Sequence, residues 1–100
     1  MTQVRISRSA EGDLLDGYSF YERQQSGIGS YFLDSLYADI DSLMLYGGMH
    51  PKPHGRLHRA LAKRFPFAIY YDLREEIVTV VAVLDCRQNP ASIVKRLRQN

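Results

Sequence analysis

The sequence predicts an α+β fold: a short N-terminal strand and an αα-hairpin packed on an antiparallel β-sheet with a three-strand meander, followed by a short C-terminal helix. Three observations predict it. Apolar residues recur at helical spacing in two segments of the first half, β-branched and aromatic residues fill three runs within 57–85, and a basic segment after residue 89 begins with a helix cap. Because neither hairpin nor sheet can bury its apolar surface alone, the hairpin is expected to cover one face of the sheet.

The first half supplies the N-terminal strand and the two helices. Val4 and Ile6 alternate with polar residues, which predicts a strand, and Ser9 is the expected N-cap of the first helix because its hydroxyl can accept from a first-turn amide. The break at Ser26-Gly27-Ile28-Gly29 precedes the second helix, and Gly47-Gly48 ends it. The apolar stripes are Ala10, Leu14, Tyr18 and Tyr21 in the first helix and Phe32, Leu36, Ile40 and Leu43 in the second, with Asp34, Asp39 and Asp41 expected to point outward.

The predicted meander runs from Leu57 to Asp85. Pro66 has no amide proton for a sheet ladder, so it marks the first corner, and the charged stretch 74–76 makes the second. The last strand is apolar on both faces and is therefore expected to be central. We expect Val78, Val80, Ala82 and Leu84 to share one face of it. Tyr70 and Tyr71 must point to opposite faces, so one is expected in the core and the other partly exposed.

The C-terminal segment reads as a short basic helix. Asn89 is a suitable N-cap, and Pro90 is favoured in the first helical position. The helix is expected over 91–97, with Ile93, Val94 and Leu97 available to dock on the rest of the chain.

Composition fits one small globular domain spanning 1–100. The chain is 45% apolar and 24% charged, and its single cysteine, Cys86, cannot form an internal disulfide. The N-terminus lacks the apolar core of a signal peptide, and the longest apolar run falls far short of the roughly 20 residues that span a bilayer. We therefore expect a cytoplasmic protein with no membrane partner.

Charge is unevenly distributed along the chain. Residues 1–50 hold seven acidic and three basic residues, whereas residues 51–100 hold four acidic and ten basic ones. A cationic second half favours an anionic partner, either a nucleic acid or an acidic protein segment.

The order of elements and several local motifs resemble the RelE/ParE superfamily of toxins from type II toxin-antitoxin systems. The resemblance covers nearly the whole chain. It rests on Ser9-Ala10-Glu11-Gly12-Asp13-Leu14, on Tyr18 and Tyr21, on Arg64-Phe65-Pro66-Phe67-Ala68-Ile69-Tyr70-Tyr71, and on Val83-Leu84-Asp85-Cys86-Arg87-Gln88-Asn89-Pro90.

The resemblance implies a toxin that a cognate antitoxin neutralises, with promoter DNA reached only through the antitoxin. ParE-like members inhibit DNA gyrase, whereas RelE-like members cleave mRNA on the ribosome. RelE-like enzymes place a basic residue after the aromatic turn, another after the last strand, and a Tyr or His in the C-terminal segment. The matching positions here are Ala68, Arg87 and Ile93, so only the arginine remains.

This pattern favours a ParE-like gyrase inhibitor without enzymatic activity. The first alternative is a ribosome-dependent endoribonuclease that would use His58, Arg64 and Arg87 for proton transfer and charge stabilisation. The second is an inactive member that serves only as antitoxin partner or co-repressor. We expect no cofactor and no metal, because Pro51 and Pro53 prevent the helix that would align His50, His54 and His58.

Cationic side chains are the expected contacts for an acidic antitoxin segment or for the target. An extended acidic segment can place carboxylates against basic residues and apolar anchors in grooves. The candidates are Arg59, Lys63, Arg87, Lys95 and Arg96.

Overall fold

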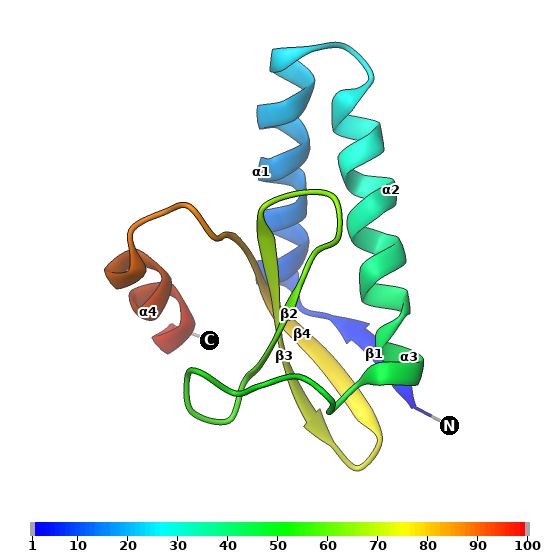
Figure 1. Cartoon of the computed structure of the whole chain (residues 1–100), viewed down its shortest axis with the longest axis vertical. Helices are drawn as coiled ribbons and strands as arrows, with labels where there is room; N and C mark the ends of the chain where they lie inside the picture. Colours follow the sequence, from blue (N-terminus) through cyan, green and yellow to red (C-terminus); the bar gives the residue numbers. More distant parts are fainter. Residues whose placement is uncertain (1, 100) are drawn as a thin grey trace.

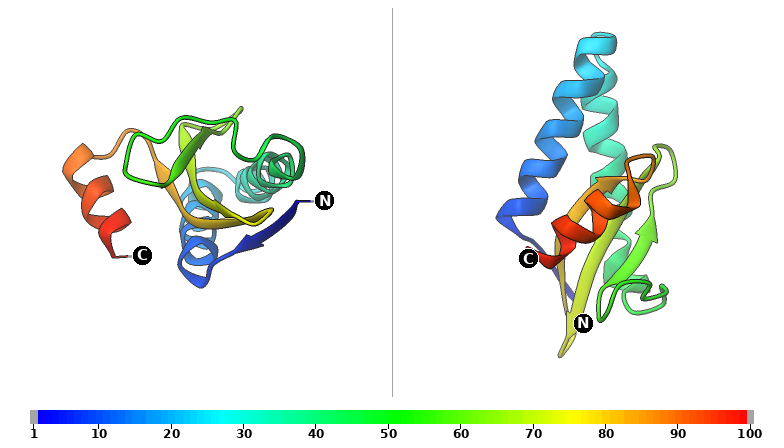
Figure 2. Two further views of the ribbon diagram at one scale, coloured as in Figure 1. Left: turned by 90° about the horizontal axis from the view of Figure 1, so that it is seen from below. Right: turned by 90° about the vertical axis from the view of Figure 1, so that its left-hand side faces the viewer.

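The computed structural model describes residues 2–99 and contains one sheet with helices on both faces (Figures 1 and 2). The terminal residues of the expected domain, 1 and 100, lie outside the described range. None of the helices in residues 2–99 combines the length and apolar character needed to cross a bilayer. The elements are β1 (Gln3–Ile6), α1 (Arg8–Gln24), α2 (Ile28–Asp41), α3 (Leu43–Tyr46), β2 (His58–Leu61), β3 (Phe67–Arg74), β4 (Ile77–Asp85) and α4 (Pro90–Arg98).

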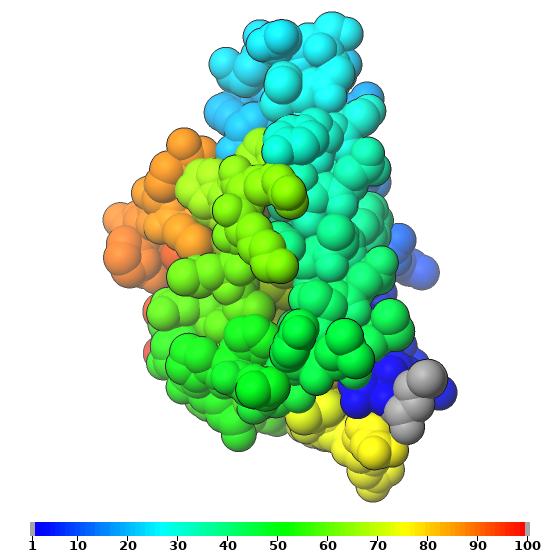
Figure 3. Space-filling model, turned by 45° about the vertical axis from the view of Figure 1, so that its right-hand side comes forward, coloured from blue at the N-terminus to red at the C-terminus, as the bar shows by residue number. Residues whose placement is uncertain are grey.

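The four strands lie in the order β1-β4-β3-β2. Strands β2, β3 and β4 pair antiparallel, which confirms the predicted meander and the central place of its last strand. Strand β1 pairs with β4 in parallel, with Gln3 opposite Ile77 and Ile6 opposite Val80, so the sheet is mixed. This pairing places the N-terminal strand beside the tip of the β3–β4 hairpin, at the lower end of the molecule in Figure 3.

Helices α1 and α2 form the predicted hairpin and cover one face of the sheet. They approach closely where Gly17 meets Phe32, since a Cβ on that glycine would lie 2.5 Å from the phenyl ring. Gly17 is thus required by packing, although glycine weakens a helix. The main core consists of Ala10, Leu14, Phe32, Leu36, Ile40, Leu43, Ala60, Phe67, Ile69, Tyr71, Val78, Val80 and Val83.

The N-cap of α1 is Ser7 and not Ser9. The Ser7 hydroxyl accepts a hydrogen bond from the backbone amide of Ala10 at 3.1 Å, and Ser9 lies within the helix. The chain can turn into the helix at once because β1 ends at Ile6. At the far end of the hairpin, the second helix ends at Asp41 and one further turn, α3, precedes Gly47-Gly48, where Gly48 has a φ of 94°.

Helix α4 covers the other face of the sheet, where it contacts Ala68, Tyr70, Ala82 and Leu84 through Ile93 and Leu97. Asn89 caps it, accepting from the amide of Ala91 at 2.8 Å, and Pro90 occupies the first turn as predicted. This second layer corrects the expectation for the tyrosine pair. Tyr70 is 2% exposed and Tyr71 is 0% exposed, so both rings are buried, on opposite faces.

A β-bulge in β4 changes which residues share a face. Tyr70 lies opposite Ala82 while Tyr71 lies opposite Val80, so Val81 is an extra residue in the ladder. Val78 and Val80 therefore face the helical hairpin, whereas Ala82 and Leu84 face α4. The prediction that all four share one face was wrong, because one inserted residue reverses the alternation beyond it.

Candidate functional site

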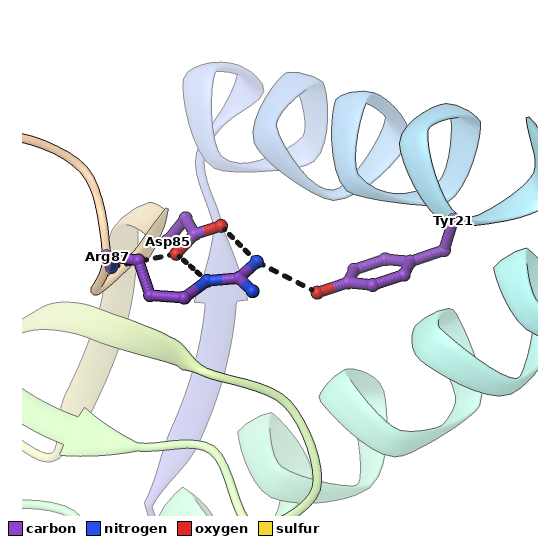
Figure 4. Close-up of polar contacts among 3 residues, drawn as sticks. All are labelled: Tyr21, Asp85 and Arg87. Atoms are coloured by element: carbon purple, nitrogen blue, oxygen red, sulfur yellow. Dashed lines mark hydrogen bonds and ion pairs between the residues drawn. The ribbon is translucent and has the colours of Figure 1, made fainter. Parts of the chain in front are cut away.

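The end of β4 carries a cluster of polar side chains that includes one predicted site residue, Arg87 (Figure 4). Its Nε and Nη2 donate to the two carboxylate oxygens of Asp85 at 3.0 and 2.8 Å, and its backbone amide donates to Asp85 Oδ1 at 2.8 Å. Nη2 also lies 3.5 Å from the hydroxyl of Tyr21. The hydrogen bonds from Arg87 hold the pKa of Asp85 below its usual range. Arg87 is thus held in place, and the neighbouring carboxylate balances its charge.

Tyr21 reaches this cluster from an aromatic group that fixes the turn between β2 and β3. Its ring lies 4.9 Å from Phe65 and 5.2 Å from Phe32, measured between centroids. The amide of Cys86 donates to the carbonyl of Pro66 at 2.8 Å, so the turn is also tied to the end of β4. Arg64 precedes Phe65 in this turn and is exposed, at the same end of the sheet as Arg87.

His58 lies elsewhere. It pairs with Tyr71 in the sheet, whereas the end of β4 pairs with Phe67, four residues away along β3. At ~3.3 Å per residue this separation is about 13 Å along the strand. The His58 side chain is 7% exposed, its ring stacks on Tyr71 at 4.8 Å, and its Nδ1 donates to the carbonyl of His50 at 2.8 Å. Of the three residues in the alternative catalytic set, Arg64 and Arg87 therefore lie at one end of the sheet, and His58 lies away from them.

The three histidines occupy different surroundings. His50 Nδ1 bonds to the hydroxyl of Tyr71 at 2.6 Å, and that hydroxyl accepts from the amide of Gly48 at 2.8 Å. Burial, and to a smaller extent the charge of His58, lower the pKa of His50. The ring of His54 lies near Tyr70, on the face covered by α4. Within residues 2–99 no group of three or more His, Cys, Asp or Glu side chains is arranged to hold a metal ion.

Lys63 lies in the turn between β2 and β3 and is exposed. Its backbone amide donates to Asp39 Oδ2 at 3.0 Å. The expectation that Asp39 points outward was wrong. This aspartate is 8% exposed, and its carboxylate accepts from a backbone amide just after β2, which is an edge strand of the sheet. A carboxylate has a hydrogen-bonding role at this position only because the fold brings the amide of Lys63 next to it.

The basic residues of α4 differ in their surroundings. Lys95 is exposed. Arg96 forms an ion pair with Asp13 of α1, with Nη1 2.7 Å from Oδ1, and the other oxygen of Asp13 accepts from the amide of Val83 at 2.9 Å. Arg96 therefore fastens α4 to α1 and β4.

Arg59, the remaining predicted cation, lies on β2 opposite Tyr70, on the face covered by α4. Its Nε is buried and has no hydrogen-bond partner among the described residues. The sequence alone could not single it out from the other arginines, since its surroundings depend on the docking of α4.

Several hollows open on the surface of the described residues, and three of them bear on the predicted site residues. The first, about 260 Å³, adjoins the end of β4 and is lined by Asp13, Asp16 and Asp85 together with Phe20 and apolar residues. Asp13 and Asp85 are paired with Arg96 and Arg87, so the arginines beside this hollow already have counter-ions and offer a phosphate group little. The second, about 320 Å³, lies between residues 54–57 and α4, and the third, about 160 Å³, lies between α2, α3 and β2.

Comparison with known proteins identifies the fold. A scan of protein-family models finds no match, and a search of curated proteins finds no significant similarity. A chain from a solved structure described as the chromosomal ParDE TA system from P. aeruginosa superposes with a TM-score of 0.77. The match covers 83% of this chain and 94% of that chain at 14% sequence identity. The chain thus shares its fold with this chain of a ParDE system, in agreement with the fold that the sequence resemblance implied.

Proposed function

We propose that this protein is the toxin of a type II toxin-antitoxin system and that it acts in the cytoplasm as a ParE-like inhibitor of DNA gyrase. The observation that carries the proposal is the superposition of most of the chain on a chain of a ParDE system. On this proposal a cognate antitoxin neutralises the protein, and promoter DNA is contacted only through that antitoxin.

The surroundings of the candidate catalytic residues support binding over nuclease chemistry. A ribonuclease needs a proton acceptor, a proton donor and free cations around one phosphate. Here His58 is buried in the core, and Arg87 is engaged with Asp85. The positions that carry basic or aromatic groups in RelE-like enzymes are filled here by Ala68 of β3 and Ile93 of α4. Both are buried in the apolar cluster between the sheet and α4.

The contact between Tyr21 and Arg87 is the one feature that favours the nuclease alternative, since a phenol beside a guanidinium can donate or accept a proton. Tyr21→Phe tests it, because the variant keeps the aromatic packing and removes the hydroxyl. We expect Tyr21→Phe to inhibit growth as strongly as the wild type. A harmless but folded variant would support proton transfer and contradict our proposal.

Proposed contacts with antitoxin or gyrase are the cations of the second half of the chain. Lys63 and Lys95 are exposed, and Arg87 is exposed as well despite its ion pair. Arg59 and Arg96 are more enclosed. We expect Lys63→Glu with Lys95→Glu to weaken inhibition, whereas Arg23→Glu in the exposed last turn of α1 serves as the charge-matched control.

Controlled expression of the chain in bacteria, with and without the reading frame next to its gene, tests the function. A gyrase inhibitor produces filaments and induces the DNA-damage response, and the purified chain then blocks supercoiling of relaxed plasmid by gyrase. Immediate arrest of translation with cleaved mRNA would instead identify the nuclease. Normal growth at a confirmed level of folded protein would identify an inactive member and overturn the toxin proposal.

A further inference from the structure

Arg59 is an incompletely satisfied cation on the α4 side of the sheet. Its backbone amide bonds to the carbonyl of Pro51 at 2.8 Å, which holds this part of β2 in place, but its buried Nε has no hydrogen-bond partner within residues 2–99. The ion pairs of these residues join Arg74 to Asp72, Arg87 to Asp85 and Arg96 to Asp13, and none includes Arg59. A partly buried guanidinium without a counter-ion has lost hydration that an incoming anion can replace.

Two polar neighbours locate this guanidinium. Burial raises the pKa of the Tyr70 hydroxyl, and both the charge of Arg59 and a side-chain hydrogen bond between Arg59 and Tyr70 oppose that rise. Burial also raises the pKa of the Cys86 thiol, and the charge of Arg59 opposes that rise as well. Arg59 therefore lies beside Tyr70, its cross-strand neighbour on the face covered by α4. Neither neighbour carries a negative charge at neutral pH, so neither serves as its counter-ion.

An apolar hollow lies near Arg59 on the same face of the sheet, and its nearest lining residue in sequence is Leu57. The hollow has a volume of about 320 Å³ and lies between α4 and the turn before β2. Leu57, just before β2 and two residues before Arg59, lines it and packs on the face covered by α4. His54 also lines the hollow, and the centroid of its ring lies 6.1 Å from that of Tyr70. Tyr70 is in turn the cross-strand neighbour of Arg59. The other lining residues are Gly55, Val94, Leu97 and Arg98.

We propose that Arg59 and this hollow form a binding site for a protein segment that carries a carboxylate next to a large apolar side chain. The carboxylate pairs with Arg59, and the apolar side chain fills the hollow between Leu57 and Val94. Arg98 on the rim adds a second positive charge. This inference rests on the proposed function, since it specifies where an antitoxin segment engages and what that segment must contain.

The lining of the hollow favours a peptide over a nucleic acid. A guanidinium binds carboxylate and phosphate equally well in geometry, so the anion alone does not decide between them. Leucine and valine side chains bury an aliphatic group well, whereas bases are usually bound by stacking on aromatic side chains or by hydrogen bonds to their edges. His54 is the one ring in this wall.

Binding to purified full-length protein tests the site by fluorescence anisotropy with three labelled probes. The first is a ten-residue peptide that alternates leucine and glutamate, about the length that follows one strand edge. The second is the same peptide with glutamine in place of glutamate, and the third is a uridine oligonucleotide. We expect saturable binding of the glutamate peptide that is at least about tenfold tighter than binding of the glutamine peptide.

Variants assign this binding to the site. Arg59→Met should weaken binding of the glutamate peptide by about tenfold or more, and Arg23→Met, which removes the same charge from the distant helical hairpin, should change it less than about twofold. Val94→Asp should also weaken it by closing the hollow to an apolar group. Circular dichroism establishes that each variant is folded, and Arg59→Lys replaces Arg59→Met if the latter is unfolded, because lysine keeps the charge but lacks the planar pair of donors.

Four results would overturn the site: no binding of the glutamate peptide, equal binding of both peptides, equal losses from Arg59→Met and Arg23→Met, or dependence on Arg59 for the oligonucleotide alone. These results are separate from the growth assay. Loss of peptide binding in a protein that still inhibits gyrase refutes the site, whereas a harmless protein that binds the peptide through Arg59 refutes the toxin proposal.

Discussion

Asp13 supplies a hydrogen-bond acceptor beside β4 where no strand does, and its removal should destabilise the fold by a predictable amount. Strand β1 stops at Ile6, opposite Val80, so no strand continues along that edge of β4. Beyond this point the Asp13 carboxylate accepts from the amide of Val83 at 2.9 Å and pairs with Arg96 at 2.7 Å. One side chain of α1 thus satisfies a strand amide and anchors α4.

The magnitude follows from the two contacts. Val83 is 1% exposed, and leaving a buried amide without an acceptor costs about 1–3 kcal/mol. The side chains of the ion pair are 14% and 23% exposed, so screening by water limits its contribution to about 1 kcal/mol. We therefore expect Asp13→Ala to lower the free energy of unfolding by about 2–4 kcal/mol. Asp13→Asn keeps an acceptor for the amide and should lose about 1 kcal/mol.

Urea denaturation followed by circular dichroism measures these differences. A double-mutant cycle of Asp13→Ala with Arg96→Met isolates the coupling between the two side chains, whatever else Arg96 contacts. We expect a coupling near 1 kcal/mol and a clear gap between Asp13→Ala and Asp13→Asn. Equal losses in the alanine and asparagine variants would refute the role assigned to the amide of Val83.

Two further predictions concern packing and pH. Gly17→Ala should destabilise the protein by about 1–3 kcal/mol, because the added Cβ would lie 2.5 Å from the ring of Phe32. Gly12→Ala, whose Cβ would meet no atom within 4 Å, should stabilise the protein by about 0.5–1 kcal/mol. Thermal unfolding compares the two variants, and equal effects would contradict the packing argument. The lowered pKa of His50 means that the unfolded chain binds protons more readily, so stability should be complete above pH 6.5 and fall as the pH drops below it. Urea midpoints at pH 7.5 and 5.5 should therefore differ more for the wild type than for His50→Gln, which keeps a polar partner for Tyr71; identical differences would exclude His50 as the cause.

The order and type of the main elements were predictable because each is encoded locally. Apolar periodicity marked the two helices, Pro66 marked the first corner of the meander, and Asn89-Pro90 marked the start of α4. The second corner also follows the prediction, since Glu75 and Glu76 adopt positive φ angles of 49° and 65° in the two-residue turn between β3 and β4.

The errors arose where a tertiary contact decides the outcome. The bulge at Val81 reverses which face the following residues of β4 point to, and no glycine or proline in the sequence indicates it. A prediction based on strict alternation therefore placed Ala82 and Leu84 on the wrong face. Asp39 looked like a solvent-facing helix residue, yet it caps an amide 24 residues away. Tyr70 is buried because α4 folds back over a face that local periodicity left open.

The sequence supplies the candidate cations of the site, but not all of the contacts that these cations make. Asp85, which pairs with Arg87, lies only two residues before it in the sequence. Asp13, which pairs with Arg96, lies 83 residues away, and only the fold brings it near. The sequence also gave no reason to separate Arg59 from its neighbours. Its distinguishing feature is the lack of a partner for Nε among the described residues, which depends on every element around it.

The parallel pairing of β1 with β4 has a consequence for biosynthesis. Because β4 is the ladder partner of β1, strand β1 cannot complete its pairing during synthesis until residues 77–80 have emerged. The helical hairpin can form early from contacts close in sequence, but the sheet is completed by a closure that links the two ends of the chain. A nascent fragment that stops before Ile77 therefore lacks the surface built on β4, and a truncated product of translation cannot assemble it.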